Sequence, residues 1–235
     1  MNEKKYRLII LINFLLILLV FLTGCQKTVK LPYWNAPDYQ LSGDDRLVGK
    51  NHLVSDIPTV NQDSTVNVVV EIPAGTREKW EVEKETGQLV WEMKNGSHRV
   101  VRYLGYPGNY GMVPRTLLSE TEGGDGDPLD VIVLGSSVPR GSILAVRIIG
   151  CLKLLDGGET DDKLVAVMPG DVLDVGTSLP EFEEAFPGVL SIVETWFVHY
   201  KGKGQMESGG FEDRDYAWHQ IDYATDAYLT NLHPE

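Results

Sequence analysis

Asp125-Gly126-Asp127-Pro128-Leu129-Asp130, followed directly by the apolar run Val131-Ile132-Val133-Leu134, is the stretch around which this chain is organised. Three carboxylates within six residues repel one another at neutral pH unless cations neutralise them. Oxygen ligands on a short loop suit Mg²⁺, Mn²⁺ or Ca²⁺, whereas Zn²⁺ or copper favours the His and Cys ligands that this loop lacks. The stretch therefore predicts a loop for a hard metal ion at the start of a strand.

Two simpler interpretations of this loop are a solvated acidic turn and a structural calcium loop. A solvated acidic turn would have the same composition, and the loop taken alone does not exclude it. A structural calcium loop of the EF-hand type fails on spacing, because Asp130 stands at the sixth position, where that loop needs Gly. Pro128 also interrupts the loop, and Ser136 stands where the last, bidentate Glu would be.

Composition limits the classes of function. The chain has 235 residues and 43% apolar content, enough for one catalytic domain with a real core plus attachments. Its formal net charge is −13, and no Lys/Arg run lies outside the first seven residues. This charge argues against nucleic acid or an anionic lipid surface as a partner. An anionic substrate would therefore need locally placed cations.

The amino terminus carries a targeting pattern. Basic residues before position 8 precede the apolar run Leu8–Leu22, which suits an export signal and is short for a membrane span. The following Leu22-Thr23-Gly24-Cys25 resembles the lipobox of bacterial lipoproteins, in which the Cys is lipidated and becomes the first mature residue. The alternative is an uncleaved anchor. Gln26 after the Cys weakly favours the outer membrane, so we expect a lipid-anchored protein on the periplasmic face of the cell envelope.

This pattern gives the expected domain organisation. Residues 1–24 form a lipoprotein signal peptide, residues 25–46 comprise the lipidated Cys25 and a flexible tether, and residues 47–235 form the catalytic domain. The tether is inferred because this segment is polar and lacks any sustained hydrophobic period.

Short β-rich runs separated by polar turns dominate the chain after the tether. Strands are expected over residues 66–72, 79–83, 89–93, 131–134, 143–149 and 164–167, with a hairpin turn at Asn95-Gly96. Apolar residues at helical spacing predict helices over Pro187–Lys201 and Asp215–Leu229. The fold class is therefore mainly β with helices (α+β), a small and mostly antiparallel barrel.

A second acidic loop strengthens the metal hypothesis. Asp156 and Asp161 lie in it, and this loop also stands at a strand junction. Acids from two loops, combined with separate cations and tyrosines, suggest a metal cluster that faces an anion. Chemistry on a phosphate anhydride needs these parts, because metals and basic groups must shield both the substrate and the leaving group.

At this point the chain resembles a known family, the soluble inorganic pyrophosphatases of family I. Motifs similar to that family's occur in the same order between about Val68 and Lys201: Glu71-Ile72-Pro73, Lys79-Trp80-Glu81, Asn109-Tyr110-Gly111, Asp125 to Val131, Asp156 to Lys163, and His199-Tyr200-Lys201. The resemblance implies a five-stranded OB-like barrel with flanking C-terminal helices. It also implies hydrolysis of pyrophosphate to two phosphates with several Mg²⁺ ions, or with Mn²⁺ in their place.

The resemblance assigns residue roles by motif. The implied metal ligands are Asp125, Asp130, Asp156, Asp161, Glu71 and Glu81, the two glutamates directly or through water. Asp127 is the implied general base for a water that bridges two metals, and Tyr110 and Lys163 complete the implied catalytic group. The implied phosphate contacts are Lys79, Arg99, Tyr110, Lys163, Tyr200 and Lys201. Arg99 is chosen over Arg102 because this region looks like the longer, eukaryotic-type enzymes.

Other functions are compatible with the same residues. The chain could hydrolyse other phosphoanhydrides, such as polyphosphate or nucleotides, or it could be a non-catalytic surface lipoprotein that binds phosphate or metal. The similarity to the longer enzyme type implies a homo-oligomer, with a dimer favoured over a hexamer.

Overall fold

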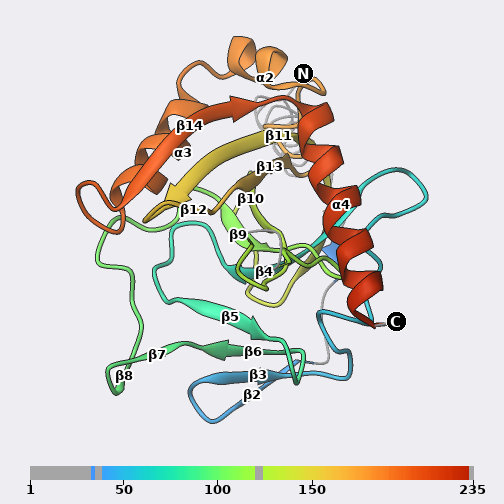
Figure 1. Cartoon of the computed structure of the whole chain (residues 1–235), viewed down its shortest axis with the longest axis vertical. Coiled ribbons are helices and arrows are strands. Elements are labelled where there is room, and N and C mark those ends of the chain that lie inside the picture. Colours follow the sequence, from blue (N-terminus) through green and yellow to red (C-terminus); the bar gives the residue numbers. More distant parts are fainter. Residues whose placement is uncertain (1–32, 35–38, 120–123, 233–235) are drawn as a thin grey trace, which may run out of the picture. The chain divides into compact units, whose positions relative to one another are not determined.

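Five strands close a ring in the computed structural model of this chain (Figure 1). The ring strands are β4 (Val66–Ile72), β9 (Asn109–Met112), β10 (Asp130–Leu134), β13 (Lys163–Val167) and β11 (Ile143–Asp156). They pair in that order, and β11 returns to β4 to complete the circuit. Every pairing in the ring is antiparallel except that of β10 with β13, which is parallel. The predicted mainly β fold, mostly antiparallel, is confirmed.

The structure describes residues 33–34, 39–119 and 124–232. The predicted signal peptide, Cys25 and the first part of the predicted tether lie outside these residues. Within the ranges described, no helix is long and apolar enough to cross a membrane.

Strand β11 joins the parts of the fold because it changes partners along its 14 residues. Its first residues pair with β4 and with β1 (Tyr33–Trp34), its middle pairs with β13, and its end pairs with β12 (Glu159–Thr160) and β14 (Met206–Glu212). The pairing with β13 shifts register between Ile148 and Gly150, as at a β-bulge. The sequence predicted that this strand would end at Ile149. Its extension carries Asp156 to the end of the strand.

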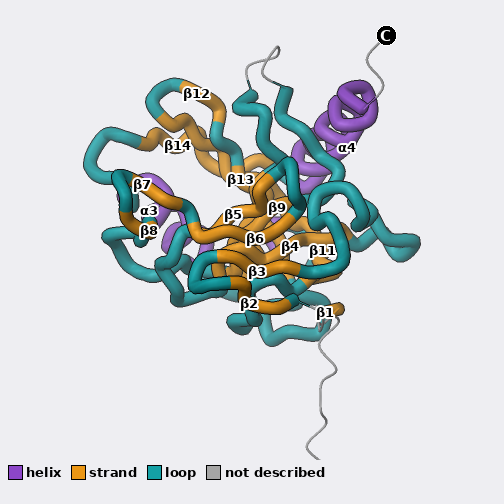
Figure 2. The backbone as a smooth tube through the Cα atoms, turned by 90° about the horizontal axis from the view of Figure 1, so that it is seen from below, coloured by secondary structure: helices purple, strands orange, loops and turns teal. Residues whose placement is uncertain are grey.

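A second sheet packs against the ring and lies in front of it in Figure 2. Its strand order is β2 (Gln40–Ser42), β3 (Arg46–Val48), β6 (Gln88–Trp91) and β5 (Trp80–Glu83). A short hairpin of β7 (Met93–Lys94) and β8 (Ser97–His98) follows it, with positive φ angles of 53° at Asn95 and 76° at Gly96. The predicted hairpin turn is therefore present. Strand β2 falls within the stretch expected to be a flexible tether, so regular structure begins before residue 47.

Three helices complete the described fold: α2 (Leu179–Ala185), α3 (Val189–His199) and α4 (Arg214–Leu232). The structure confirms the two helices expected from the sequence, whereas α2 was not predicted. Helix α2 begins after Ser178, whose side-chain oxygen accepts a hydrogen bond from the Glu181 N–H, so a capping residue marks its start.

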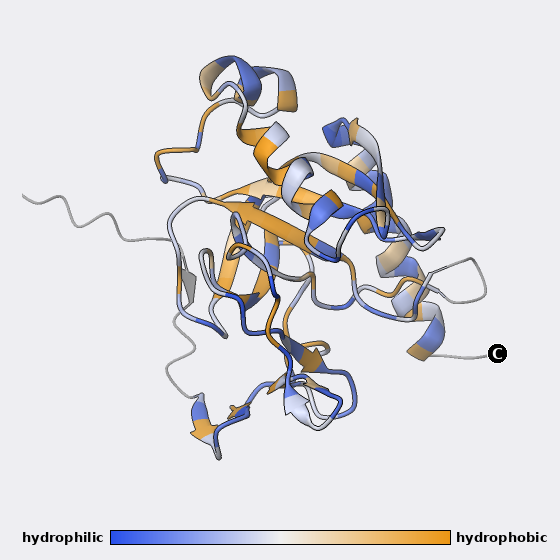
Figure 3. Cartoon of the chain, turned by 90° about the vertical axis from the view of Figure 1, so that its left-hand side faces the viewer, coloured by the Kyte–Doolittle hydropathy of each residue, from blue (hydrophilic) through white to orange (hydrophobic). Residues whose placement is uncertain are grey.

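The ring strands are largely buried on both faces. All seven residues of β4 and all five of β13 are buried, and Figure 3 shows the central strands as mainly hydrophobic. Along β10, Val131 and Val133 pack in a cluster with α4, while Ile132 and Leu134 pack in a second cluster with α2 and α3. Strands buried on both faces read as continuous apolar runs. Polar residues at the ends of these rigid strands are consequently held in fixed positions.

Candidate active site

One cavity, of about 470 Å³, brings the predicted site residues together. Its lining includes every site residue proposed from the sequence within the described part of the chain, with the exception of Lys163: Glu71, Lys79, Glu81, Arg99, Tyr110, Asp125, Asp127, Asp130, Asp156, Asp161, Tyr200 and Lys201. We call this space the acidic cavity. Its lining also includes Lys84, which was not among the predicted site residues.

Different strands deliver these side chains to the acidic cavity. Glu71 lies on β4, Glu81 on β5 and Tyr110 on β9, while Asp130 begins β10 and Asp156 ends β11. Residues far apart in the sequence therefore converge because the ring and the second sheet bring their strands together.

The 125–130 loop is held by its own backbone and by Lys84. Gly126 adopts a φ of 77°, a left-handed conformation that glycine tolerates well. The backbone N–H of Asp127 donates to the Asp125 carboxylate at 2.9 Å. The Lys84 ammonium donates to the Asp127 carboxylate at 2.6 Å and to the Gly126 carbonyl at 2.9 Å. Lys84 comes from the turn after β5, and no local sequence signal links it to this loop.

Lys163 lies beneath the acidic cavity, with its side chain 3% exposed. Its ammonium pairs with the carboxylates of Asp130 and Asp161, each at 2.7 Å. Burial alone would lower the pKa of Lys163, but these two carboxylates outweigh burial and raise it. Burial would likewise raise the pKa of Asp130, yet Lys163 and Lys79 lower it. The three groups therefore form a charged cluster at the floor of the cavity, with the two carboxylates in its lining and Lys163 behind them.

Glu71 is the most deeply buried acid of the cavity, at 5% exposure. Burial raises the pKa of Glu71 to about 8, although Lys79 opposes this shift. Its carboxylate accepts one hydrogen bond from the Val82 N–H at 2.8 Å. Burial also raises the pKa values of Glu81 and Asp125. Three acids of this cavity thus disfavour ionisation in the absence of added positive charge.

Two tyrosines present phenols to the same space. Burial raises the pKa values of Tyr110 and Tyr200 above that of an ordinary phenol, so both are hydrogen-bond donors at neutral pH. The Tyr200 ring stacks on Trp196 with centroids 4.7 Å apart and an interplanar angle of 10°. The Trp196 indole donates to the Leu104 carbonyl at 3.0 Å, which fixes the surface under Tyr200.

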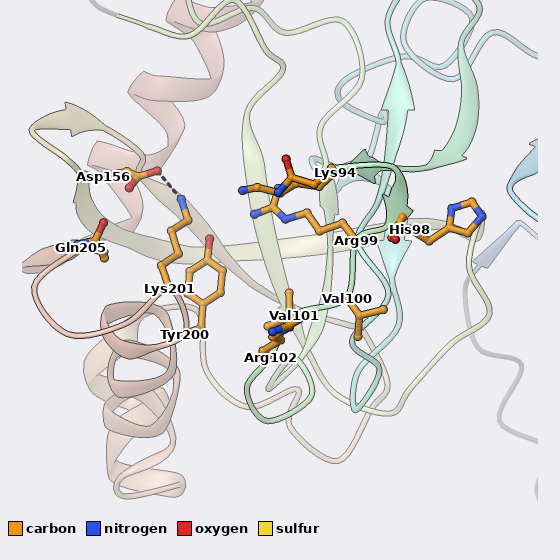
Figure 4. A pocket seen from close by; sticks show the side chains of 12 residues that line it. Lys94, His98, Arg99, Val100, Val101, Arg102, Asp156, Tyr200, Lys201 and Gln205 are labelled. Atoms are coloured by element: carbon orange, nitrogen blue, oxygen red, sulfur yellow. Dashed lines mark hydrogen bonds and ion pairs between the residues drawn. The ribbon is translucent and has the colours of Figure 1, made fainter.

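A second cavity, of about 840 Å³, adjoins the acidic cavity and shares four lining residues with it (Figure 4). The shared residues are Arg99, Asp156, Tyr200 and Lys201. Lys201 forms an ion pair with Asp156, and Arg99 forms one with Glu92 at 2.6 Å. Arg102, the alternative to Arg99 as a phosphate contact, lines only the second cavity.

The acidic cavity contains the type of ligand atom that a hard divalent cation binds. They are carboxylate oxygens, the ligands that Mg²⁺ and Mn²⁺ prefer, and burial has raised the pKa of three of them. In the described part of the chain, however, no three His, Cys, Asp or Glu side chains are arranged to hold a metal ion. Lys84, Lys163 and Lys201 instead pair with these acids. The expected ligands are thus in one cavity, without a formed coordination geometry.

Comparison with known proteins identifies one family to which this chain is similar. The family described as inorganic pyrophosphatase matches residues 68–229. The chain is similar to inorganic pyrophosphatase 1 of Caenorhabditis elegans, with 35% identity over 218 residues that cover 82% of this chain and 50% of the relative. It is also similar to the mitochondrial inorganic pyrophosphatase of Saccharomyces cerevisiae, with 38% identity over 158 residues that cover 59% of this chain and 51% of the relative. The chain spans about half the length of these two curated relatives.

Solved structures show the same fold. A type I inorganic pyrophosphatase from Toxoplasma gondii superposes with a TM-score of 0.76 at 29% identity, covering 81% of this chain and 97% of that one. A Trypanosoma cruzi vacuolar soluble pyrophosphatase, truncated at its N-terminal domain and in complex with PPi, superposes with a TM-score of 0.72 at 27% identity. That match covers 77% of this chain and 79% of the other. Because the family match spans most of the chain and includes the strands that build the acidic cavity, this chain belongs to the inorganic pyrophosphatase family.

Proposed function

We propose that this chain hydrolyses inorganic pyrophosphate to two phosphates with the help of Mg²⁺. The observation that carries the proposal is the convergence, in one cavity, of six acids at the expected ligand positions with cations and phenols that can face a diphosphate. A non-catalytic phosphate- or metal-binding protein would need fewer of these groups. Family membership supports the same chemistry.

Asp125, Asp130, Asp156, Asp161, Glu71 and Glu81 would hold the metal. Bound Mg²⁺, or Mn²⁺ in its place, would shield the charge of pyrophosphate and acidify a water. Glu71 supports the binding of a cation, because burial raises its pKa to about 8 and nearby positive charge would favour the ionised form.

Asp127 would accept the proton of the attacking water. Its side chain is 57% exposed, so a water can reach it. Lys79, Arg99, Tyr110, Tyr200 and Lys201 would hold the two phosphoryl groups and stabilise the charge that moves to the leaving phosphate. Lys163, beneath the floor, would act on the same charge from below together with Tyr110.

The test is a phosphate-release assay on the full chain in detergent, with and without Mg²⁺. We expect two phosphates per pyrophosphate with Mg²⁺ and only background release with EDTA. Asp127→Asn should abolish most of the Mg²⁺-dependent release while leaving the melting temperature unchanged. Absence of release at saturating Mg²⁺ and Mn²⁺ would contradict the proposal.

We further propose that the chain works outside the cytoplasm on a lipid anchor. Support comes from the apolar run Leu8–Leu22 and the lipobox-like Leu22-Thr23-Gly24-Cys25. Residues 1–24 would be removed, Cys25 lipidated, and the protein held on the periplasmic face, with the outer membrane favoured. Mass spectrometry of the protein from bacterial membranes should find a lipid-modified Cys25 at the new amino terminus. An unmodified chain that still begins at Met1 would contradict this.

We also propose that the protein is a homo-oligomer, with a dimer preferred to a hexamer. The support is the similarity of its motifs to the longer enzyme type. Light scattering of the detergent-solubilised protein, corrected for bound detergent, should give twice the mass of one chain. A monomer or a hexamer would contradict the proposal.

A further inference from the structure

Two strands that carry predicted metal ligands belong to different sheets. Glu71 lies on β4 in the ring, whereas Glu81 lies on β5 in the second sheet, and Lys79 comes directly before β5. Among the described residues, no strand pairing joins β4 to β5. The distance between these site residues therefore depends on side-chain contacts between the two strands.

Arg140 makes such a contact from the turn that precedes β11. The turn is fixed on β4, because the Gly141 N–H donates to the Val70 carbonyl at 2.8 Å and the Val70 N–H donates to the Ser142 carbonyl at 2.9 Å. From this base the Arg140 Nε donates to the backbone carbonyl of Glu71 at 2.8 Å. The arginine thus holds the main chain at the residue whose side chain lines the acidic cavity.

The same guanidinium reaches the second strand. Its Cζ lies 4.5 Å from the centroid of the Trp80 ring, within the range of a cation–π contact, and its Nη2 lies 3.7 Å from the Glu78 carboxylate. Trp80 stands between two predicted site residues in the sequence, is 4% exposed and stacks on Trp91 with centroids 5.8 Å apart. A planar guanidinium stacks on an aromatic face as a lysine ammonium does not. Arg140 therefore connects the end of β4 to the start of β5.

Arg140 does not line the acidic cavity, so it acts on the site only through the residues that it contacts. A second link between the strands is the hydrogen bond from the Val82 N–H to the Glu71 carboxylate. A metal ion held by Glu71 would compete for that carboxylate. The hydrogen bond from Arg140 goes to the main-chain carbonyl of Glu71 instead, and it is compatible with a metal on the side chain.

We propose that Arg140 is a positioning residue, which holds Glu71 of β4 at a fixed distance from the segment 79–81 at β5 and so raises the affinity of the acidic cavity for divalent cations. This inference rests on the proposed function, in which Glu71 and Glu81 are metal ligands. Arg140 contacts neither metal nor substrate in this role. Loss of a group that orients metal ligands typically lowers metal affinity by about 10- to 100-fold. Because Arg140 acts through the main chain, we expect the lower end of this range.

The experiment measures Mn²⁺ binding by electron paramagnetic resonance on the full chain in detergent, together with the Mg²⁺ dependence of phosphate release and the melting temperature. Arg140→Met removes the hydrogen bond and the stack, whereas Arg140→Lys keeps the positive charge without the planar group. Arg147→Met is the matched control. Arg147 also pairs with an acid, Asp174, and donates to a backbone carbonyl, that of Gly176 at 3.2 Å, but it does not line the acidic cavity.

For Arg140→Met we expect about tenfold weaker Mn²⁺ binding and a matching shift of the Mg²⁺ activation curve to higher concentration, while kcat at saturating Mg²⁺ changes much less. Arg140→Lys should behave similarly, because charge alone does not replace the stack, and it decides the question if Arg140→Met does not fold. Arg147→Met should lower the melting temperature and leave Mn²⁺ affinity unchanged.

Three results would overturn the positioning role: wild-type Mn²⁺ affinity in Arg140→Met, wild-type affinity in Arg140→Lys, or an equal loss of affinity in Arg147→Met. A wild-type chain that binds Mn²⁺ but releases no phosphate from pyrophosphate would contradict the proposed function instead, and the Mn²⁺ affinities would still decide the role of Arg140. A wild-type chain that binds no Mn²⁺ would contradict both.

Discussion

Replacement of Lys163 by Met should destabilise the metal-free protein strongly. The Lys163 side chain is 3% exposed, and its ammonium lies 2.7 Å from both Asp130 and Asp161. Met fills a similar volume but removes the ammonium that pairs with both carboxylates, although Lys79 still acts on Asp130. Removal of one partner from a buried ion pair costs about 3–5 kcal/mol. Because the side chains of Asp130 and Asp161 are 28% and 19% exposed, water can solvate them in part, and we expect about 3 kcal/mol.

Urea unfolding in EDTA would measure this loss. For a domain of this size, ~3 kcal/mol corresponds to a fall in melting temperature of roughly 6–12 °C. Lys84→Met is the matched control, since Lys84 pairs with Asp127 at 2.6 Å but both side chains are about half exposed. Exposed pairs contribute only about 0–1 kcal/mol. If Lys163→Met loses no more stability than Lys84→Met, the argument from burial is wrong.

The pH dependence provides a separate check on the same pair. The pKa of Lys163 is raised, so its contribution is complete below the unfolded value and is lost only as the pH rises through the folded value. The pKa of Asp130 is lowered, so its contribution is present above the unfolded value and is lost as the pH falls through the folded value. Without Lys163, burial is expected to raise the pKa of Asp130 in the variant. The stability difference between wild type and Lys163→Met should therefore be largest near neutral pH and shrink as the pH falls. A difference that stays constant down to acid pH would contradict the assigned charges.

Three further substitutions separate folding from catalysis. Gly111→Ala should prevent soluble folding, because the added Cβ would stand 1.9 Å from the Val69 carbonyl oxygen between β4 and β9; recovery of soluble protein with native circular dichroism would refute this. Asp127→Asn should slow phosphate release by about 10² or more, the scale of losing a general base, and unchanged kcat would remove it from that role. Trp196→Phe deletes an indole hydrogen bond and weakens the stack under Tyr200. We expect about 1–2 kcal/mol lower stability and a higher KM for pyrophosphate. An unchanged KM would contradict the inference that Trp196 positions Tyr200.

The strands of the ring could be predicted because burial on both faces leaves a clear signal. Val66–Ile72 and Val131–Leu134 are apolar runs bounded by polar turns, and both form strands where expected. Strand β14 gave no such signal. Its sequence, Met206–Glu212, is polar and contains two glycines, and it forms a strand because it pairs with the end of β11. Long-range pairing of this kind cannot be predicted from local periodicity.

Nearly all of the site residues predicted from the sequence motifs line the acidic cavity, whereas several elements of the fold were not predicted. Asp130 begins β10, whose apolar run was predicted correctly, whereas Asp156 ends a strand that is longer than predicted. Lys84 was missed because its contact with Asp127 spans 43 residues and depends on how the turn after β5 meets the 125–130 loop. The second cavity was missed for a related reason. Lys94 lies in the β7–β8 hairpin, and Lys201 lies just after the end of α3. Only the folded chain brings these two elements together.

Three lysines of the site form ion pairs with its acids. Lys84, Lys163 and Lys201 each neutralise an acid that is a proposed base or metal ligand. A divalent cation held by Asp156 would compete with Lys201 for the same oxygens, and a phosphate oxygen could then pair with the displaced ammonium. Metal and pyrophosphate would therefore favour each other's binding, and by linkage each would raise the other's affinity by the same factor. Under the proposed function, the net charge of −13 would not prevent recognition of an anion, because bound metals and the released lysines would supply the attraction locally.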